Sequence, residues 1–118
     1  MDDHLLSILH DHARGAVKVR SSRHAAAVTV KGNILSLGQN RMKTHPMMFR
    51  FSQNHNKVYL HAEIDAIVRC INRYGVDVLR DATLSVVRIG SAGDITNSQP
   101  CEHCQKAIEA FGLKAEWT

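Results

Sequence analysis

The chain has 118 residues, of which 44% are hydrophobic, and a formal net charge of +4 at pH 7. We therefore expect one domain over residues 1–118 with a real core, and we do not expect two linked domains. No apolar run approaches the length of a membrane span, and the N-terminus lacks the basic and hydrophobic regions of a signal peptide, so we expect a cytoplasmic protein without a membrane segment.

The first half of the chain predicts a helix, a hairpin and a long loop. Apolar residues recur at helical spacing from about residue 3 to residue 17. Two apolar runs, at 25–30 and 34–37, flank a turn at 31–33, which predicts a β-hairpin. Residues 39–57 are a polar loop, and a loop of that length in a compact domain is usually functional.

The second half predicts helices that alternate with strands. A second helix is expected from about residue 59 to residue 74, with Gly75 as its stop. Residues 82–89 predict a third strand, followed by a loop over 90–99 and a third helix over 100–111. A short strand ends the chain. Strands separated by helices imply a mixed or parallel sheet with helices packed on its faces.

Two short segments carry the residues with the most specific chemistry. They read His-Ala-Glu at 61–63 and Pro-Cys-Glu-His-Cys at 100–104. Together they supply three residues of the types that bind zinc: His61, Cys101 and Cys104. Structural zinc sites close with four protein ligands, whereas catalytic sites use three and leave the fourth position to water. The inventory favours a catalytic Zn²⁺ site.

The surroundings of these residues support the same interpretation. Glu63 need not be a ligand, and it would sit beside the bound water as a proton shuttle. Pro100 suits the first position of a helix, which places Cys101 and Cys104 on one face of its first turn. The positive end of a helix lowers the pKa of a thiol, and the thiolate is the form that binds metal.

Other interpretations of the cysteines stay open at this point. A Cys-x-x-Cys pair at the start of a helix is also typical of thioredoxin-like redox proteins. A closed structural zinc site would need a fourth ligand, and His103 is a candidate, although its direction on the helix should differ from that of the cysteines. Cys70 lies in an apolar helical stretch and is expected to be an inert core thiol. The other histidines have no ligand spacing and are expected at the surface or in packing: His4, His10, His12, His24, His45 and His55.

The two segments resemble the zinc-dependent cytidine and deoxycytidylate deaminase superfamily, in which His-Ala-Glu precedes Pro-Cys-x-x-Cys. Gly-Gln-Asn at 38–40 is similar to the Gly-x-Asn with which many members hold the base. Lys-Thr-His-Pro at 43–46, followed by 60–67, looks like small deaminases of the deoxycytidylate and phage-encoded kind. Two departures are Gln99, where many members have Glu, and the end of the chain at Thr118, where many continue with a further helix and strand.

The resemblance covers nearly the whole chain and implies a fold. That fold is an α/β protein with a three-layer α/β/α core and a mixed central sheet of about four strands. The chain would be either a minimal or a C-terminally shortened version of it.

The resemblance also implies an activity, the zinc-dependent hydrolytic deamination of a nucleobase. Cytosine in a nucleotide or nucleoside, such as deoxycytidylate, is the expected substrate. Glu63 would take a proton from the water held by Zn²⁺ and pass protons to the ring nitrogen and to the departing ammonia. Asn40 and the backbone N–H of Ala62 would orient the base, and Ser98 would contact the ring or the sugar.

The charge distribution bears on the substrate. No acidic residue lies between Asp11 and Glu63, a stretch that contains many lysines and arginines. This is consistent with a solvated basic surface and also with attraction of a phosphate-bearing substrate. Arg41 and Lys43 follow Asn40 closely, so we expect them to reach a phosphate.

Two further functions and an assembly state remain possible from the sequence. A deaminase that acts on single-stranded DNA or RNA is the second hypothesis. A zinc-stabilised binding module or Cys-x-x-Cys redox protein without hydrolytic activity is the third. A short sheet with uncovered edges favours a homo-oligomer.

Overall fold

The computed structural model describes residues 1–18, 22–42, 45–51 and 60–118, apart from the side chains of Phe49 and Phe51. Its elements in chain order are α1 (Asp3–Arg14), β1 (Arg23–Val30), β2 (Asn33–Gln39), α2 (Pro46–Phe51), α3 (Ala62–Tyr74), the 3₁₀ helix η1 (Asp77–Asp81), β3 (Thr83–Ile89), β4 (Ile95–Thr96), α4 (Glu102–Ala110) and β5 (Lys114–Trp117). Within this part of the chain, no helix has both the length and the apolar character that a membrane crossing requires.

The sheet is mixed, as expected from strands separated by helices. β1 lies antiparallel between β2 and β3. β4 pairs antiparallel with one end of β3, and β5 pairs parallel with the rest of the same edge. Because β4 and β5 share that edge, five strands give a sheet four strands wide. The strand β4 corrects the predicted loop over 90–99, within which it lies.

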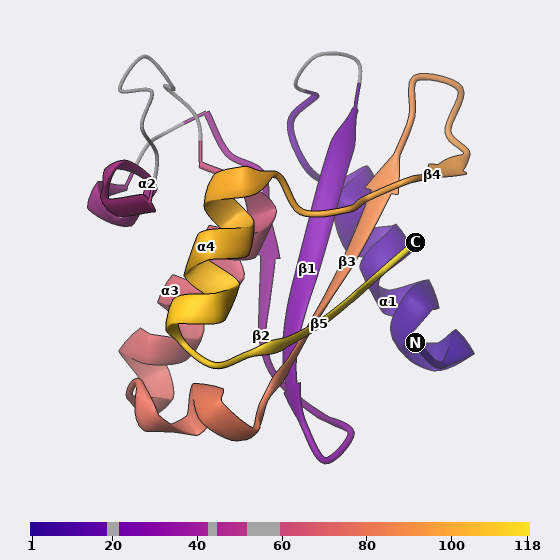
Figure 1. Cartoon of the computed structure of the whole chain (residues 1–118). Coiled ribbons are helices and arrows are strands. Elements are labelled where there is room, and N and C mark those ends of the chain that lie inside the picture. Colours follow the sequence, from indigo (N-terminus) through magenta and orange to yellow (C-terminus); the bar gives the residue numbers. More distant parts are fainter. Residues whose placement is uncertain (19–21, 43–44, 52–59) are drawn as a thin grey trace.

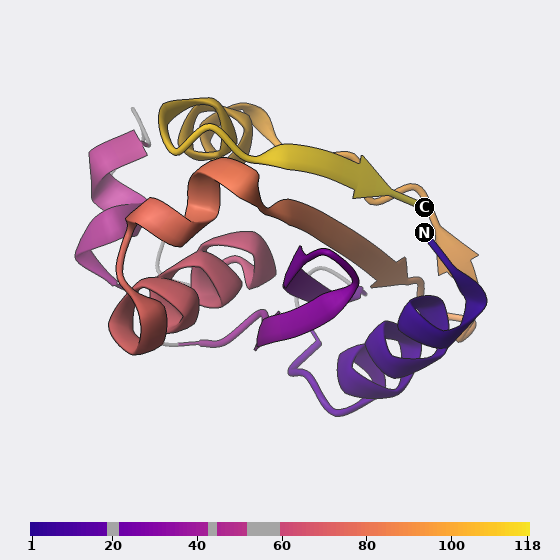
Figure 2. The same cartoon turned by 90° about the horizontal axis from the view of Figure 1, so that it is seen from below.

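Helices cover both faces of this sheet, as Figures 1 and 2 show, with α1 on one face and α3 and α4 on the other. The alternation of side chains along β1 explains the two layers. Ala25 and Ala27 pack with the buried side of α1, whereas Ala26 and Val28 belong to the cluster under α3 and α4. The predicted three-layer α/β/α fold is confirmed.

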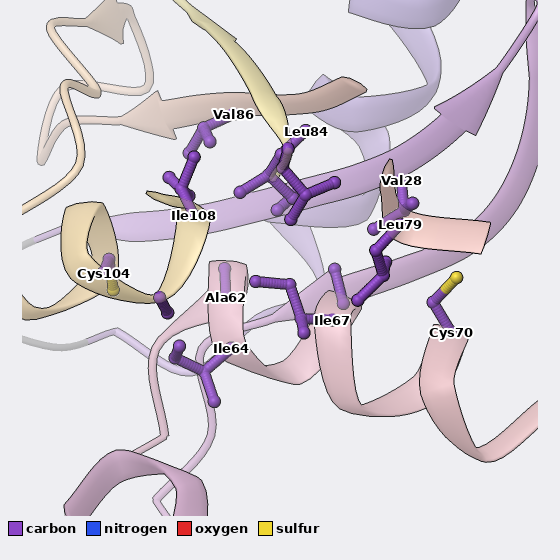
Figure 3. Packing of buried hydrophobic residues seen from close by; sticks show 14 of the residues in the cluster. Val28, Ala62, Ile64, Ile67, Cys70, Leu79, Leu84, Val86, Cys104 and Ile108 are labelled. Carbon is purple, nitrogen blue, oxygen red and sulfur yellow. The ribbon is translucent and has the colours of Figure 1, made fainter. Parts of the chain in front are cut away.

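The core between the sheet and α3 and α4 holds the larger of the two hydrophobic clusters. Side chains from α3, β3 and α4 meet there (Figure 3). Its fully buried members include Val28, Ile64, Ile67, Leu79, Leu84, Val86, Cys104 and Ile108. Cys104, one of the predicted ligands, is thus anchored in the packed interior.

The predicted loop over 39–57 is partly helical, which is a correction. α2 occupies Pro46–Phe51. Proline fits the first position of a helix. The Nδ1 atom of His45 accepts a hydrogen bond from the backbone N–H of Met47, and Met48 is buried in the core. Residues 52–59 lie outside the described part of the chain, as do Lys43 and Thr44.

At Gly38 the strand β2 lies close against the backbone of α3. A Cβ atom at this position would lie 2.5 Å from the carbonyl oxygen of Ala62 and closer still to the backbone nitrogen of Ala66. Both neighbours are backbone atoms of α3, so the helix itself would have to move. The Gly of the Gly-x-Asn motif is therefore required by packing between this strand and the helix that begins at the site.

We expect Gly38→Ala to lower the free energy of unfolding by about 1–3 kcal/mol, the usual cost of overpacking a core. Urea unfolding monitored by circular dichroism measures the effect. Gly15→Ala is the matched control, because a Cβ atom there would meet its nearest neighbour at 3.6 Å, an ordinary contact. Equal stabilities for the two variants would show that the close approach of β2 and α3 is not required.

Candidate metal centre

Two predicted ligands lie immediately before helices rather than inside them. His61 is the N-cap of α3 (φ −74°, ψ 148°), and Cys101 is the N-cap of α4 (φ −69°, ψ 170°). The predicted start of the last helix at Pro100 is corrected by this, since Pro100 precedes the N-cap. The fixed φ of proline suits extended backbone as well as the first helical turn. The positive ends of two helices therefore converge on the site.

The histidine and the two cysteines lie at the spacing that zinc imposes. The Nδ1 atom of His61 is 3.5 Å from the Sγ of Cys101 and 3.4 Å from the Sγ of Cys104. With Zn–S bonds of about 2.3 Å and Zn–N bonds of about 2.0 Å, tetrahedral coordination separates nitrogen and sulfur by roughly 3.5 Å. The donor types and their separations both fit Zn²⁺.

His103 also lies in this cluster, and the expectation that it points away from the cysteines is wrong. The donor atoms of His61, Cys101, His103 and Cys104 all lie within 4.8 Å of one another. The rings of the two histidines meet edge to face with their centroids 4.4 Å apart. That expectation assumed that Cys101 and His103 are both part of the helix, where residues two apart point in different directions. Because Cys101 has extended backbone at the N-cap, the helical rotation between the two residues does not apply.

Without metal, the pKa values of the Cys101 and Cys104 thiols are shifted in opposite directions. The hydrogen bond from Cys104, together with those from His103 and His61, lowers the pKa of Cys101 well below its usual range. The pKa of Cys104 is raised, first by its hydrogen bond to Cys101 and then by burial. Metal binding requires both sulfurs as thiolates, so it would release any thiol proton that remains on the pair.

Glu63 lies beside the cluster in the first turn of α3 and is 5% exposed. Burial raises the pKa of its carboxyl group, and a hydrogen bond links this carboxyl to the side chain of Cys104. Within the described residues, Glu63 is not part of the group that could hold an ion. A buried carboxyl group with a raised pKa, next to the ligands but separate from them, is suited to accept and return protons.

Asn40 is brought next to the centre by a short backbone pairing of the following residue. The N–H and C=O groups of Arg41 pair with those of Leu60, which directly precedes His61. Leu60 is therefore extended, which corrects the predicted helix start near residue 59. Asn40 is buried, and its Oδ1 accepts a hydrogen bond of 2.7 Å from the N–H of His24.

The amide nitrogen of Asn40 donates to the carbonyl oxygen of Val17 over 2.5 Å. The side chain thus ties the start of β1 to the segment that follows α1. An amide group has a second hydrogen and a second acceptor lone pair, so a contact with a base is compatible with both bonds. That contact stays a prediction.

Arg41 is oriented by a buried carboxylate that the sequence analysis missed. Its Nε donates to Asp65 over 3.1 Å, and Asp65 also accepts hydrogen bonds from the backbone N–H of Gln39 and the Nε of Arg69. Asp65 is 4% exposed, whereas the side chain of Arg41 is 31% exposed. The signal in the sequence was the Asp-Arg pair at i and i+4 on α3.

Ser98 has structural partners. Its hydroxyl donates to the carbonyl oxygen of Val86 over 2.8 Å, and it accepts a hydrogen bond from the N–H of Thr118. These bonds tie the segment before α4 to the residue after β5. The predicted contact of Ser98 with a ring or a sugar stays a prediction. Lys43, the other predicted phosphate contact, lies outside the described residues.

The comparisons with known proteins decide the family. The family model described as the cytidine and deoxycytidylate deaminase zinc-binding region matches residues 1–116. The chain belongs to this family. The predicted superfamily, the enzyme class of zinc-dependent hydrolase and the zinc cofactor are thereby confirmed. Membership of this deaminase family supports deamination of cytosine nucleotides or nucleosides in general.

Solved structures show the same fold. The chain is similar to the dCMP deaminase from cyanophage S-TIM5 in apo form, with a TM-score of 0.60 and 21% identity, covering 99% of this chain and 84% of that one. It is similar to the same phage enzyme in complex with dCMP and dUMP, with a TM-score of 0.59 and 19% identity, covering 99% and 82%. A cytidine deaminase from Mycobacterium tuberculosis matches with a TM-score of 0.57 and 18% identity, covering 100% and 85%. No curated protein matches the sequence.

His24 is a further residue of this deaminase that the sequence analysis set aside as surface or packing. It shares a face of β1 with Ala26 and Val28, the face that α3 and α4 cover. Burial lowers its pKa to about 4, aided by the charges of Arg88 and His61, while Cys101 acts in the opposite direction. A neutral imidazole therefore lies on the metal-binding side of the sheet. The position of His24 on this face of the sheet follows from the pairing of β1 with its neighbouring strands, which the sequence alone does not reveal.

We expect His24 to make the metal-free protein less stable as the pH falls from 6.5 towards 4. The unfolded chain protonates the imidazole below its ordinary pKa of 6.5, whereas the folded state keeps it neutral to about pH 4. The unfolded state therefore binds more protons than the folded state between pH 6.5 and pH 4. The contribution of His24 to the stability of the folded protein is complete only above pH 6.5 and is lost as the pH falls. Urea unfolding with a chelator present should show a smaller decline for His24→Gln than for the wild type. Equal declines would contradict the assignment.

Proposed function

We propose that this deaminase removes the amino group of cytosine in deoxycytidylate or a close relative, through one domain spanning residues 1–118. The observation that carries the proposal is the position of Glu63. It is a buried carboxyl group with a raised pKa, hydrogen-bonded to Cys104 and lying beside a His-Cys-Cys group spaced for zinc. A redox pair would have no use for this carboxyl group, and a purely structural metal site would not need a proton carrier.

The proposed ligands are His61, Cys101 and Cys104. Zinc held there supplies Lewis acidity, which lowers the pKa of a water molecule to about 7. Glu63 accepts one proton of the attacking water and delivers it to the ring nitrogen beside the amine-bearing carbon. The second proton of the water goes to the amino group, which leaves as ammonia while the oxygen becomes the new carbonyl. Proton transfer by a positioned side chain contributes about 10²–10⁴-fold to the rate.

The base would be oriented by groups at the start of α3 and the end of β2. The N–H of Ala62 is in the first turn of α3, where backbone N–H groups have no partner within the helix. Asn40 lies beside the centre through the pairing of Arg41 with Leu60. Ser98 is kept as a weaker candidate for the ring or sugar. These roles rest on the resemblance and on proximity.

A phosphorylated substrate is favoured by Arg41. The residue follows Asn40 directly, and Asp65 holds its Nε while leaving the side chain partly exposed. A guanidinium group that is fixed in this way loses little conformational freedom when it binds a phosphate. Lys43 is a second candidate for the same phosphate.

Ammonia release from a panel of compounds tests the proposal. The panel holds dCMP, CMP, deoxycytidine, cytidine, adenine nucleotides and a single-stranded oligonucleotide, and dCMP should have the highest kcat/KM. Arg41→Gln should lower kcat/KM for dCMP by about tenfold or more, the worth of a hydrogen bond to a charged group, and leave deoxycytidine unchanged. Arg80→Gln, on the exposed side of η1, is the control. Preference for the oligonucleotide, with strong salt dependence, would favour the nucleic-acid hypothesis instead.

The assembly and location are further parts of the proposal. Among the described residues, β2 pairs on one side only, with β1, so an edge of the sheet is open. An open edge supports a homo-oligomer. A cytoplasmic location suits thiolate ligands, because a reducing compartment keeps thiols from forming disulfides. Size-exclusion chromatography with light scattering would measure the oligomeric state.

A further inference from the structure

We propose that Arg88 binds the phosphate group of the substrate, with the hydroxyl of Thr96 as a second contact in the same subsite. This role rests on the proposed function, because it concerns how the same site recognises a nucleotide. Neither residue belongs to the motifs that identify the family, and both lie outside the metal centre.

Arg88 lies at the end of β3 that is close to the metal centre. The start of β1, the end of β3 and the starts of α3 and α4 lie together at the upper end of the sheet in Figure 1. Val87 and Ile89 pack in the cluster with α1. Because side chains alternate along a strand, Arg88 points to the other face, which α3 and α4 cover. There it is directly opposite His24 of β1.

Electrostatic interactions also place the guanidinium group of Arg88 near the metal ligands. Burial, followed by the charges of Arg88 and His61, lowers the pKa of His24 to about 4, whereas Cys101 acts in the opposite direction. His24 is thus within electrostatic range of Arg88 and of two ligands. Neighbouring strands are about 4.8 Å apart, so Arg88 is one strand beyond a side chain that borders the centre. A phosphate linked through a sugar to a base at the metal would extend over this distance.

Arg88 is partly buried and lacks the partner that a buried cation needs. Its Nε is buried without a hydrogen-bond partner, and none of the ion pairs among the described residues involves it. The segments 19–21, 43–44 and 52–59, which lie outside the description, contain no Asp or Glu. The chain therefore provides no carboxylate for this guanidinium. A partly buried charge without a counter-charge is unfavourable, and an anionic ligand would supply one.

Two other arginines show how a guanidinium group is held when its role is structural. The Nε of Arg23 donates to the carbonyl oxygen of Ala16 over 3.0 Å, and the Nε of Arg69 donates to Asp65 over 3.1 Å. The Nε of Arg88 has no such acceptor among the described residues. Its donors are therefore left for a ligand, and the planar guanidinium group matches the oxygens of a phosphate.

Thr96 supplies a second unpaired group beside Arg88. The two residues are directly opposite each other on β4 and β3, so their side chains lie on the same face of the sheet. The Oγ1 atom of Thr96 is buried and has no hydrogen-bond partner in the described part of the chain. Buried polar atoms are nearly always paired, so each exception needs an explanation. A phosphate bound by the guanidinium group and this hydroxyl would give both a partner.

Arg88 and Arg41 are compatible as contacts of one phosphate. They lie at the ends of β3 and β2, on either side of the start of β1. A phosphate monoester carries about −1.5 to −2 charges at pH 7 and has three acceptor oxygens. One guanidinium group neutralises only part of this charge, whereas two match it.

Binding of dUMP, the product of the proposed reaction, tests the role of Arg88 without turnover. Isothermal titration calorimetry of the zinc-loaded protein compares dUMP with deoxyuridine, which lacks the phosphate. Arg88→Gln should weaken dUMP binding by about tenfold or more, the worth of a hydrogen bond to a charged group, and leave deoxyuridine unchanged. Arg14→Gln, an exposed position on α1 at the other face of the sheet, is the matched control.

Thr96→Val provides a second variant in case Arg88→Gln does not fold. It keeps the shape of the side chain and removes the hydroxyl, so dUMP binding should weaken by about two- to tenfold with deoxyuridine unchanged. Equal losses for dUMP and deoxyuridine would indicate a contact with the base or sugar and overturn the phosphate role. Unchanged dUMP binding in Arg88→Gln would also overturn it.

Ammonia release separates this role from the proposed function. Deamination would be refuted, and the nucleotide subsite retained, if no compound in the panel released ammonia while dUMP binding still depended on Arg88. Equal losses of kcat/KM for dCMP and deoxycytidine in Arg88→Gln would retain the enzyme and refute the subsite.

Discussion

Glu63→Gln should retain a full complement of zinc and lose activity by about 10²–10⁴-fold in kcat. Glutamine has nearly the same shape as glutamate, so the first turn of α3 and the contact with Cys104 should persist. It cannot carry a proton between water, ring nitrogen and amine. The burial that raises the pKa of Glu63 in the wild type suits it to this exchange. Steady-state ammonia release and elemental analysis of bound zinc measure both parts of the prediction.

The control for this variant is Glu109→Gln, a matched change on the exposed side of α4. It should leave turnover and zinc content at the wild-type level. Full turnover in Glu63→Gln would remove the proton-shuttle role. Loss of zinc from Glu63→Gln would instead mean that the carboxyl group helps to hold the ion.

Cys104→Ala should lose zinc and activity together. The side chain of Cys104 is fully buried and lies 3.4 Å from the Nδ1 of His61, so no other thiol of the described structure can replace it. Zinc bound at 100 times its Kd contributes about 2.7 kcal/mol to stability, and that contribution should disappear. We expect less than about one tenth of an equivalent of zinc after dialysis, since loss of a ligand costs more than the 10–100-fold of an outer-shell change.

Cys70→Ala is the matched control for the loss of a buried thiol. Cys70 is also fully buried, and Figure 3 shows it on α3 at the other end of the core from Cys104. Its removal should cost stability through a small cavity and leave the zinc content unchanged. Chelation of zinc from the wild type should reproduce the activity loss of Cys104→Ala, and full zinc content in Cys104→Ala would refute its role as a ligand.

The sequence by itself determined the family, the three-layer fold and the zinc chemistry. His61, Cys101 and Cys104 are recognisable because few residue types bind zinc and their spacing with Glu63 follows a known motif. The apolar periods of β1, β3 and α3 were readable because local side-chain patterns report which face is buried. The expected loop positions of α2 and β4 were wrong, because a short helix and a two-residue strand leave little periodicity.

Only the tertiary structure decided which side chains surround the ligands. His103 joins the cluster because Cys101 has extended backbone at an N-cap, a dihedral state that residue spacing does not reveal. His24 reaches the metal side of the sheet through the register of β1, and Asp65 orients Arg41 through a contact between residues 24 positions apart. Such contacts depend on how helices and strands pack, and burial then sets the pKa values. The residue types specify the chemistry, and packing decides which of them take part.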